Sequence, residues 1–248
     1  MSELSDKIAY ITINPSGKFM KSAQAGFDAV GLQPRYLIHV NPRNRIMQEY
    51  KRYKLGVVSR FLLPKFKQHF GNKKSFSEET INIPIPVKFT CASLREDALV
   101  EFIKNSGITY LVNCGAGIFP RKVIDLPGLQ IINAHAGALP LYRNMNVVEW
   151  ALFNGHPVVG TIHKIAPGID TGDILYQEEL HFSGVSDHVS LRESAFDQVI
   201  RLAGKVVLEH SRGNIAPAKQ DHSQGKNWYI MHSYFRNIID KVISEKYH

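Results

Sequence analysis

The sequence predicts an α/β protein with a doubly wound, mostly parallel sheet. Near its start, an apolar run at 7–13 is followed by a tight turn at 14–17 and an amphipathic helix over 19–30. That order of strand, turn and helix opens a doubly wound sheet, in which ligands bind beyond the strand ends. The run 108–112 is mainly apolar, as expected for a strand in the middle of a parallel sheet.

Further elements follow in the same rhythm along the chain. Apolar residues alternate around Pro84 and Pro86, which predicts an edge strand or an extended connection at 81–89, because proline cannot donate to a strand ladder. A long helix is expected before Gly213. The other expected elements are strands at 35–40, 129–132 and 158–165, and helices at 147–154 and 231–242.

The composition is that of a globular protein. A chain of 248 residues can bury a sizeable core, and 44% hydrophobic with 21% charged residues does not indicate disorder. Its two cysteines, Cys91 and Cys114, are too few for a disulfide framework and lack metal-ligand spacing, so we expect no metal site. The start does not resemble a signal peptide and no apolar run is long enough to span a bilayer. We therefore expect a cytoplasmic protein that does not act on a membrane.

The net charge of +8 is concentrated in one segment. Residues 41–74 contain ten basic residues and one acidic residue, Glu49. This segment interrupts the order of strands and helices, so we interpret it as an insertion at the sheet edge or a flap over the substrate. It could contact the phosphates of a nucleotide-linked substrate, a tRNA or an anionic membrane, or it could be a solvated face. Its aromatic residues suit base stacking or a small core, and their helical spacing favours the core.

Three polar side chains near two predicted strand ends form the candidate site. The strand at 129–132 leads into Asn133 and His135, which lie on the same side of an extended chain. The strand at 158–165 leads into Asp170, and glycines on both sides of Asp170 allow the backbone to turn tightly. A lone histidine is more often structural, but a hydrogen-bond donor, an imidazole and a carboxylate in one ordered set favour catalysis. His163, on the strand before Asp170, could lie near this set, but we expect it to be a packing residue.

Several motifs in a fixed order extend this pattern from 107 to 180. They are Asn133-x-His135, Leu139-Pro140-x-Tyr142-Arg143, Trp150-Ala151-Leu152-x-Asn154-Gly155, Gly160-Thr161-Ile162-His163 and Gly168-Ile169-Asp170-Thr171-Gly172-Asp173-Ile174-Leu175. Several ordered blocks are far more specific than one short motif. The region resembles the 10-formyltetrahydrofolate-dependent formyltransferases, which include glycinamide ribonucleotide, methionyl-tRNA and sugar N-formyltransferases.

The resemblance implies a role for each site residue. Asn133 and His135 are expected to stabilise the oxyanion that forms when an amine attacks the formyl carbon, and Asp170 is expected to orient His135 and to carry a proton through water. The co-substrate would be 10-formyltetrahydrofolate. Its pterin ring is expected between two loops, one with Ile118 and Phe119 and the other with Ala166, Pro167, Gly168 and Ile169.

One position departs from the family pattern. The family usually has glycine after Tyr142 and Arg143, and Asn144 stands there in this chain. Asparagine is the residue best able to replace glycine at positive φ, so we expect the turn to survive.

We expect a catalytic domain over 1–180, with the basic insertion at 41–74, and a helical appendage over 181–248. About 68 residues follow Leu180, mostly helical by pattern. This favours a sugar N-formyltransferase over the tRNA enzymes, which resemblance implies carry a C-terminal β-barrel. The expected substrates are thus the folate donor and a nucleotide-linked amino sugar, in a setting of surface polysaccharide biosynthesis. We also expect a homodimer through the C-terminal helix.

Four alternatives stay open. Two are the methionyl-tRNA and glycinamide ribonucleotide formyltransferases. A third is formyltetrahydrofolate deformylase, although that family places a regulatory domain before the catalytic one and here the first strand starts at Lys7. The fourth is a basic RNA-binding module without catalysis, against which the intact Asn133, His135 and Asp170 argue. We therefore do not expect nucleic acid as the partner.

Overall fold

The computed structural model describes residues 1–41 and 84–247. Apart from its first residue, the basic segment 41–74 lies outside the described residues, so its role as an insertion or flap stays a prediction. The start of the predicted edge strand, 81–83, also lies outside them.

The core is a seven-stranded sheet with the order β3-β2-β1-β4-β5-β7-β8. Its strands are β1 (Ile8–Thr12), β2 (Tyr36–Val40), β3 (Val87–Cys91), β4 (Tyr110–Asn113), β5 (Gln130–His135), β7 (Val159–Lys164) and β8 (Ile174–Glu179). The first five are parallel, whereas β7 pairs antiparallel with β5 and β8 antiparallel with β7. The predicted doubly wound, mostly parallel sheet is therefore confirmed.

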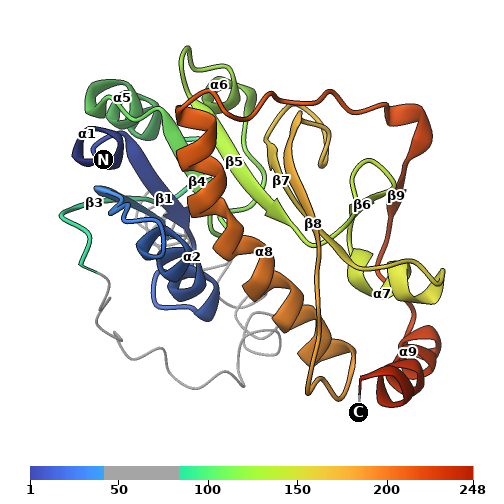
Figure 1. The fold of residues 1–248 in the computed structure, drawn as a ribbon. Helices are drawn as coiled ribbons and strands as arrows, with labels where there is room; N and C mark the ends of the chain where they lie inside the picture. Colours follow the sequence, from blue (N-terminus) through green and yellow to red (C-terminus); the bar gives the residue numbers. More distant parts are fainter. Residues whose placement is uncertain (42–83, 248) are drawn as a thin grey trace, which may run out of the picture.

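Helices cover both faces of this sheet (Figure 1). One face carries α2 (Lys18–Asp28) and α8 (His188–Ser211), and the other carries α5 (Asp97–Ser106) and α6 (Arg121–Ile124). Strand β1 contributes Ile8 and Tyr10 to the first core, and Ala9 and Ile11 to the second. Because successive side chains of a strand point to opposite faces, a strand buried on both sides must be apolar throughout. A short helix, α1 (Ser2–Ser5), precedes β1.

Helix α8 belongs to the sheet layers, although it falls within the predicted appendage 181–248. It packs against α2 and against β5 and β7. The two helices cross in backbone contact, since a Cβ on Gly204 would lie 2.4 Å from the carbonyl oxygen of Gly26. The position of a domain boundary stays a prediction, but α8 is a layer of the α/β core.

The chain after α8 returns along the far edge of the sheet (Figure 1). Ala218 pairs with Ile174 in an isolated bridge, and the short helix η1 (His222–Gln224) follows. Strand β9 (Lys226–Trp228) then pairs in parallel with β6 (Tyr142–Asn144), which lies just after the predicted site residues of β5. This C-terminal segment therefore supports the loop that follows β5.

Helix α9 (Ser233–Lys246) ends the described chain. Its buried residues, Ile239 and Ile243, lie in the same core as α7 (Val147–Phe153) and α8, and α9 contacts both helices. We expected the apolar stripe of this helix to form a homodimer interface. Part of that stripe is instead covered by α7 and α8 of the same chain, and the homodimer stays a prediction. Among the helices that the structure describes, none combines the length and apolar character needed to cross a membrane.

Candidate active site

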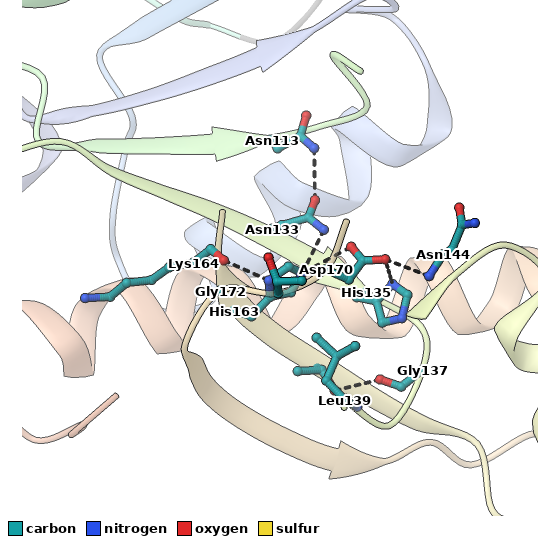
Figure 2. A network of polar contacts seen from close by, with 12 residues as sticks. Asn113, Asn133, His135, Gly137, Leu139, Asn144, His163, Lys164, Asp170 and Gly172 are labelled. Carbon is teal, nitrogen blue, oxygen red and sulfur yellow. Dashed lines mark hydrogen bonds and ion pairs between the residues drawn. The ribbon is translucent and has the colours of Figure 1, made fainter. Parts of the chain in front are cut away.

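The predicted site residues converge at the end of β5. Asn133 and His135 are part of β5, which continues three residues beyond its predicted end at 132. In the antiparallel register with β7, Asn133 pairs with His163. The loop 165–173 after β7 folds back so that Asp170 lies between His135 and His163 (Figure 2). The structure thus brings together all three predicted catalytic residues and adds His163.

Asp170 is held by its own loop and by two other segments. Its backbone adopts the left-handed conformation, with φ of +53°. Its Oδ2 accepts a hydrogen bond of 2.9 Å from the backbone N–H of Asn144, and its backbone carbonyl accepts one of 3.0 Å from the side-chain amide of Gln220. The carboxylate therefore points at the histidines from a fixed backbone.

Asn144 adopts the conformation that the sequence predicts. Its φ is +81°, so asparagine does occupy a turn that glycine usually fills in the family. Because this turn aims the Asn144 N–H at Asp170, the departure from the family pattern preserves a contact with the site.

His135 has one ring nitrogen committed to the backbone. Its Nε2 donates a hydrogen bond of 2.7 Å to the carbonyl of Tyr142. A carbonyl can only accept, so Nε2 carries a proton in every state. Nδ1 lies 3.6 Å from Oδ2 of Asp170, and the side chain is only 8% exposed. Proton exchange at His135 is therefore limited to Nδ1.

His163 is part of the polar network, so our expectation of a mere packing residue was wrong. Its Nδ1 donates a hydrogen bond of 2.8 Å to the carbonyl of Lys164, and its Nε2 lies 3.0 Å from Nδ2 of Asn133 and 3.6 Å from Oδ1 of Asp170. The signal in the sequence was its position seven residues before Asp170. That spacing indicates proximity only once β7 is known to run antiparallel to β5.

Burial keeps His163 neutral. It lowers the pKa of His163 to about 4 from the usual 6.5, and the nearby charge of His135 adds to this effect, while Asp170 opposes it. The neutral ring with its proton on Nδ1 has a lone pair on Nε2, which accepts from Asn133.

The lowered pKa of His163 predicts a pH dependence of stability. Between pH 4 and 6.5 the unfolded chain binds this proton and the folded chain does not, so the free energy of unfolding rises with pH across this window and falls on acidification. The total change in the free energy of unfolding across this window is on the order of 3 kcal/mol. Denaturant titrations of wild type and His163→Gln at several pH values are expected to show a flatter dependence in the variant. The exposed His181, changed to Gln, is the control; an equal slope in wild type and His163→Gln would contradict this assignment.

A cavity of about 650 Å³ lies beside this network. Its wall contains Asn133 and Asp170 and residues from both predicted pterin loops: Ile118, Phe119, Ala166, Pro167, Gly168 and Ile169. Ile118 is 83% exposed, as a residue that covers a ligand would be, whereas Phe119 is buried. The sequence reasoning missed Asn113, Arg121, Ile124, His163, Ile165 and Thr171 in this wall. His135 is not in the wall and reaches the cavity only through Asp170.

Comparisons with known proteins agree with this geometry. The sequence pattern of the family described as formyl transferase matches residues 43–200, more than half of the chain. The methionyl-tRNA formyltransferase of Solibacter usitatus is 35% identical over 133 residues, covering 53% of this chain and 43% of that protein. The chain spans about half the length of the curated relatives it matches.

Two solved structures share the fold. A sugar N-formyltransferase from Shewanella sp FDAARGOS_354 superposes with a TM-score of 0.54 at 16% identity, covering 97% of this chain and 88% of the other. A 4-N formyltransferase from Francisella tularensis gives a TM-score of 0.57 at 16% identity, covering 98% and 89%. Since the family pattern spans most of the catalytic sheet and the site, the chain belongs to the formyl transferase family.

Proposed function

We propose that this protein transfers the formyl group of 10-formyltetrahydrofolate to a primary amine. The observation that carries the proposal is the convergence of Asn133, His135 and Asp170 beside a cavity large enough for a pterin ring. Transfer requires an oxyanion to be stabilised, one proton to leave the attacking amine and one proton to reach the leaving nitrogen. The side chains present supply a donor for the first task and titratable groups for the other two.

Asn133 is the direct oxyanion donor in this proposal. One hydrogen of its NH₂ group is used by His163, and the second is available at the cavity wall. A fixed donor aimed at the developing charge is commonly the largest catalytic contribution. We expected His135 to donate as well, but its Nε2–H is committed to Tyr142.

Asp170 and His135 handle the protons. Nε2 of His135 always carries a proton, so in a neutral ring Nδ1 has only a lone pair, and this lone pair faces the carboxylate of Asp170. An ionised carboxylate can only accept a hydrogen bond, so two acceptors would then face each other. Nδ1 and Oδ2 lie 3.6 Å apart, within ion-pair range but beyond direct hydrogen-bond range, so in this proposal a proton on Nδ1 turns the contact into an attractive one. In the reaction Asp170 accepts the proton that the attacking amine loses, directly or through water, and a proton of the pair passes to the nitrogen that leaves as the C–N bond breaks.

The residues around the cavity fit the folate donor. A flat heterocycle requires apolar walls and backbone hydrogen-bonding groups, which the loops at 117–121 and 165–171 provide. The bound donor supplies an activated formyl group on nitrogen. Ile118 and Ile169, both exposed, would then be covered by the ring.

For the acceptor we propose a nucleotide-linked amino sugar. A second cavity of about 550 Å³ lies against β6 and β9 and is lined by Tyr142, His156, Lys226 and Trp228, among others. Trp228 stacks on Tyr142 with ring centroids 5.3 Å apart. The ammonium of Lys226 lies 4.1 Å from the Trp228 ring centroid. Aromatic surface suits a base and a cation suits a phosphate, which supports a nucleotide-linked acceptor at this cavity.

A tRNA acceptor is the second candidate. It is favoured by the sequence relatives, since those with 26–35% identity are methionyl-tRNA formyltransferases. Glycinamide ribonucleotide formyltransferase and the deformylase differ from the proposal only in the acceptor, an amine on a ribonucleotide or water.

The test is release of tetrahydrofolate from 10-formyltetrahydrofolate with a panel of acceptors. The panel contains UDP-, GDP- and dTDP-linked amino sugars, glycinamide ribonucleotide and methionyl-tRNA, with no acceptor as the control. Turnover with one sugar nucleotide supports the proposal. Turnover only with charged tRNA or with glycinamide ribonucleotide would replace the acceptor, and release without any acceptor would indicate hydrolysis. Absence of release together with absence of folate binding would reject formyl transfer.

A further inference from the structure

We propose that Asn113 is a positioning residue that fixes the orientation of the Asn133 side-chain amide, so that an N–H and not the carbonyl oxygen faces the cavity. The proposal rests on the proposed function, in which that N–H binds the oxyanion. A side-chain amide can rotate by half a turn and exchange its oxygen and nitrogen with little change in shape. An enzyme that uses the N–H as a donor must therefore prevent the orientation in which the oxygen takes its place.

A chain of four hydrogen bonds runs through both amides, and Figure 2 shows its links from Asn113 to Asn133 and from Asn133 to His163. The backbone N–H of Ala116 donates to Oδ1 of Asn113 at 2.8 Å, and Nδ2 of Asn113 donates to Oδ1 of Asn133 at 2.9 Å. Nδ2 of Asn133 then donates to Nε2 of His163 at 3.0 Å, and Nδ1 of His163 donates to the carbonyl of Lys164 at 2.8 Å. In all four bonds the donor is the group nearer to Ala116 and the acceptor is the group nearer to Lys164.

The two backbone groups at the ends determine this direction. The N–H of Ala116 can only donate, so the oxygen of Asn113 must face it and the NH₂ group must face Asn133. The carbonyl of Lys164 can only accept, so Nδ1 of His163 is protonated and Nε2 of the neutral ring can only accept. Both ends independently require the oxygen of Asn133 toward Asn113 and its nitrogen toward His163.

The sheet itself brings Asn113 to this position. Asn113 is the last residue of β4 and pairs in register with Asn133 of the parallel strand β5. Side chains in register on neighbouring strands project on the same side about 4.8 Å apart, within hydrogen-bonding reach for two asparagines. Gly115, with φ of +84°, turns the chain so that the Ala116 N–H points back at the Asn113 oxygen.

A reversed Asn133 amide would disable the site in two ways. Its oxygen would present a lone pair to the developing oxyanion in place of a donor, and its NH₂ group would face the NH₂ group of Asn113. A second proton on His163 would favour that reversal, because Nε2–H requires an acceptor. Asp170 and His135 are the titratable groups that face His163, and burial keeps the ring neutral against the pull of Asp170.

Asn113→Asp is the discriminating variant. The carboxylate still accepts from Ala116 but places an acceptor opposite the oxygen of Asn133, so the Asn133 amide is expected to reverse. Loss of one oxyanion donor lowers kcat by about 10²–10³-fold, and that is the expected result here. Asn113→Ala removes the constraint without imposing the reverse orientation, so its kcat is expected to fall less, by about 10-fold. Asn214→Asp, the same chemical change at an exposed position, is the control and is expected to leave kcat unchanged.

A second measurement is independent of turnover. NMR of ring ¹⁵N-labelled histidine is expected to show His163 of the wild type as the neutral Nδ1–H tautomer. In Asn113→Asp the reversed Asn133 offers its oxygen to Nε2 and the new carboxylate attracts the imidazolium, so the pKa of His163 is expected to rise by at least about one unit. The added charge acts equally when Asn113→Asp is combined with Asn133→Ala, so the His163 shift that reports the reversal is the part of this rise that the double variant lacks. Asn113→Ala is expected to show no such shift. Circular dichroism checks that the variants are folded. If Asn113→Asp does not fold, Asn113→Ala still tests the proposal by a fall in kcat that exceeds any change in KM for the folate, whose cavity Asn113 also lines.

The outcomes separate this proposal from the proposed function. The expected order of kcat together with the His163 shift supports both. If the wild type transfers formyl groups but Asn113→Asp keeps wild-type kcat, or if both variants lose kcat equally without a His163 shift, Asn113 has no orienting role. If the wild type has no transferase activity but the His163 shift appears, the orienting role stands and the proposed function fails.

Discussion

Asn in place of Asp170 is expected to lower kcat for formyl transfer by about 10³-fold or more, with the fold intact, because an amide cannot take the proton that the attacking amine loses. The change is nearly isosteric, and asparagine tolerates the left-handed backbone at this position, where φ is +53°. Its side-chain oxygen can still accept from the N–H of Asn144. Single-turnover release of tetrahydrofolate measures the loss, and denaturant unfolding checks the fold.

His135→Ala is also expected to abolish transfer, since Asp170 then loses its ion-pair partner 3.6 Å away. This variant differs from Asp170→Asn in stability, because the Tyr142 carbonyl loses its partner in a buried position. Leaving that carbonyl unpaired costs about 1–3 kcal/mol. Unfolding measurements on both variants therefore distinguish loss of chemistry from loss of structure.

Asp173→Asn is the matched control for Asp170→Asn. It makes the same substitution three residues further along the same loop, at a carboxylate that takes no part in the contacts of Asp170 with His135, His163 and Asn144. Activity close to wild type is expected. Wild-type activity in Asp170→Asn or in His135→Ala would remove that residue from the mechanism, and equal losses in Asp170→Asn and Asp173→Asn would indicate a general effect of charge on the loop.

Gly172→Ala is expected to destabilise the protein by at least about 3 kcal/mol, at the upper end for overpacking, and to inactivate it. A Cβ at this position would lie 1.8 Å from the backbone carbonyl oxygen of Lys164 and 3.2 Å from the N–H nitrogen of Ala166. Neither atom belongs to a flexible side chain, so the whole loop must move. The loop carries Asp170 and ends in the hydrogen bond between Lys164 and Asp173, so its movement would also pull the carboxylate away from the histidines.

Gly107→Ala separates this clash from ordinary glycine strain. Gly107 has φ of +69° at the end of α5, and nothing lies within 4 Å of an added Cβ. The Gly107→Ala substitution is expected to lower the free energy of unfolding by only about 1 kcal/mol and to leave activity unchanged. Urea denaturation of both variants gives the comparison. A Gly172→Ala protein as stable and active as Gly107→Ala would show that the loop relaxes without consequence.

Much of the candidate site could be predicted from the sequence because its signals are local. Asn133 and His135 follow an apolar strand pattern directly, and their spacing places both side chains on one face. The glycines that flank Asp170 mark a tight loop, and one of them, Gly172, proves to have no room for a side chain. The positive φ of Asn144 followed in the same way from the residue type alone.

Other parts of the site depend on contacts between distant segments. No pattern indicates that β7 runs antiparallel to β5, since a strand connected through a helix is usually parallel. The antiparallel direction of β7 places His163 beside Asn133. The strand order β1-β4-β5 places Asn113 beside Asn133 on the opposite side from His163. Each of these residues, taken alone in the sequence, has the features of an ordinary strand residue.

The sequence by itself determined the fold class, the positions of most strands of the large sheet and the family resemblance, and it supplied the three candidate site residues. The reason is that periodicity, turn residues and motif spacing are properties of short stretches of chain. Only the tertiary structure decided the direction of the hydrogen bonds through Asn113, Asn133 and His163, and the support that β9 gives to β6. The physical reason is that a hydrogen bond needs two groups within about 3 Å, and which groups meet is set by strand order and register across the whole sheet.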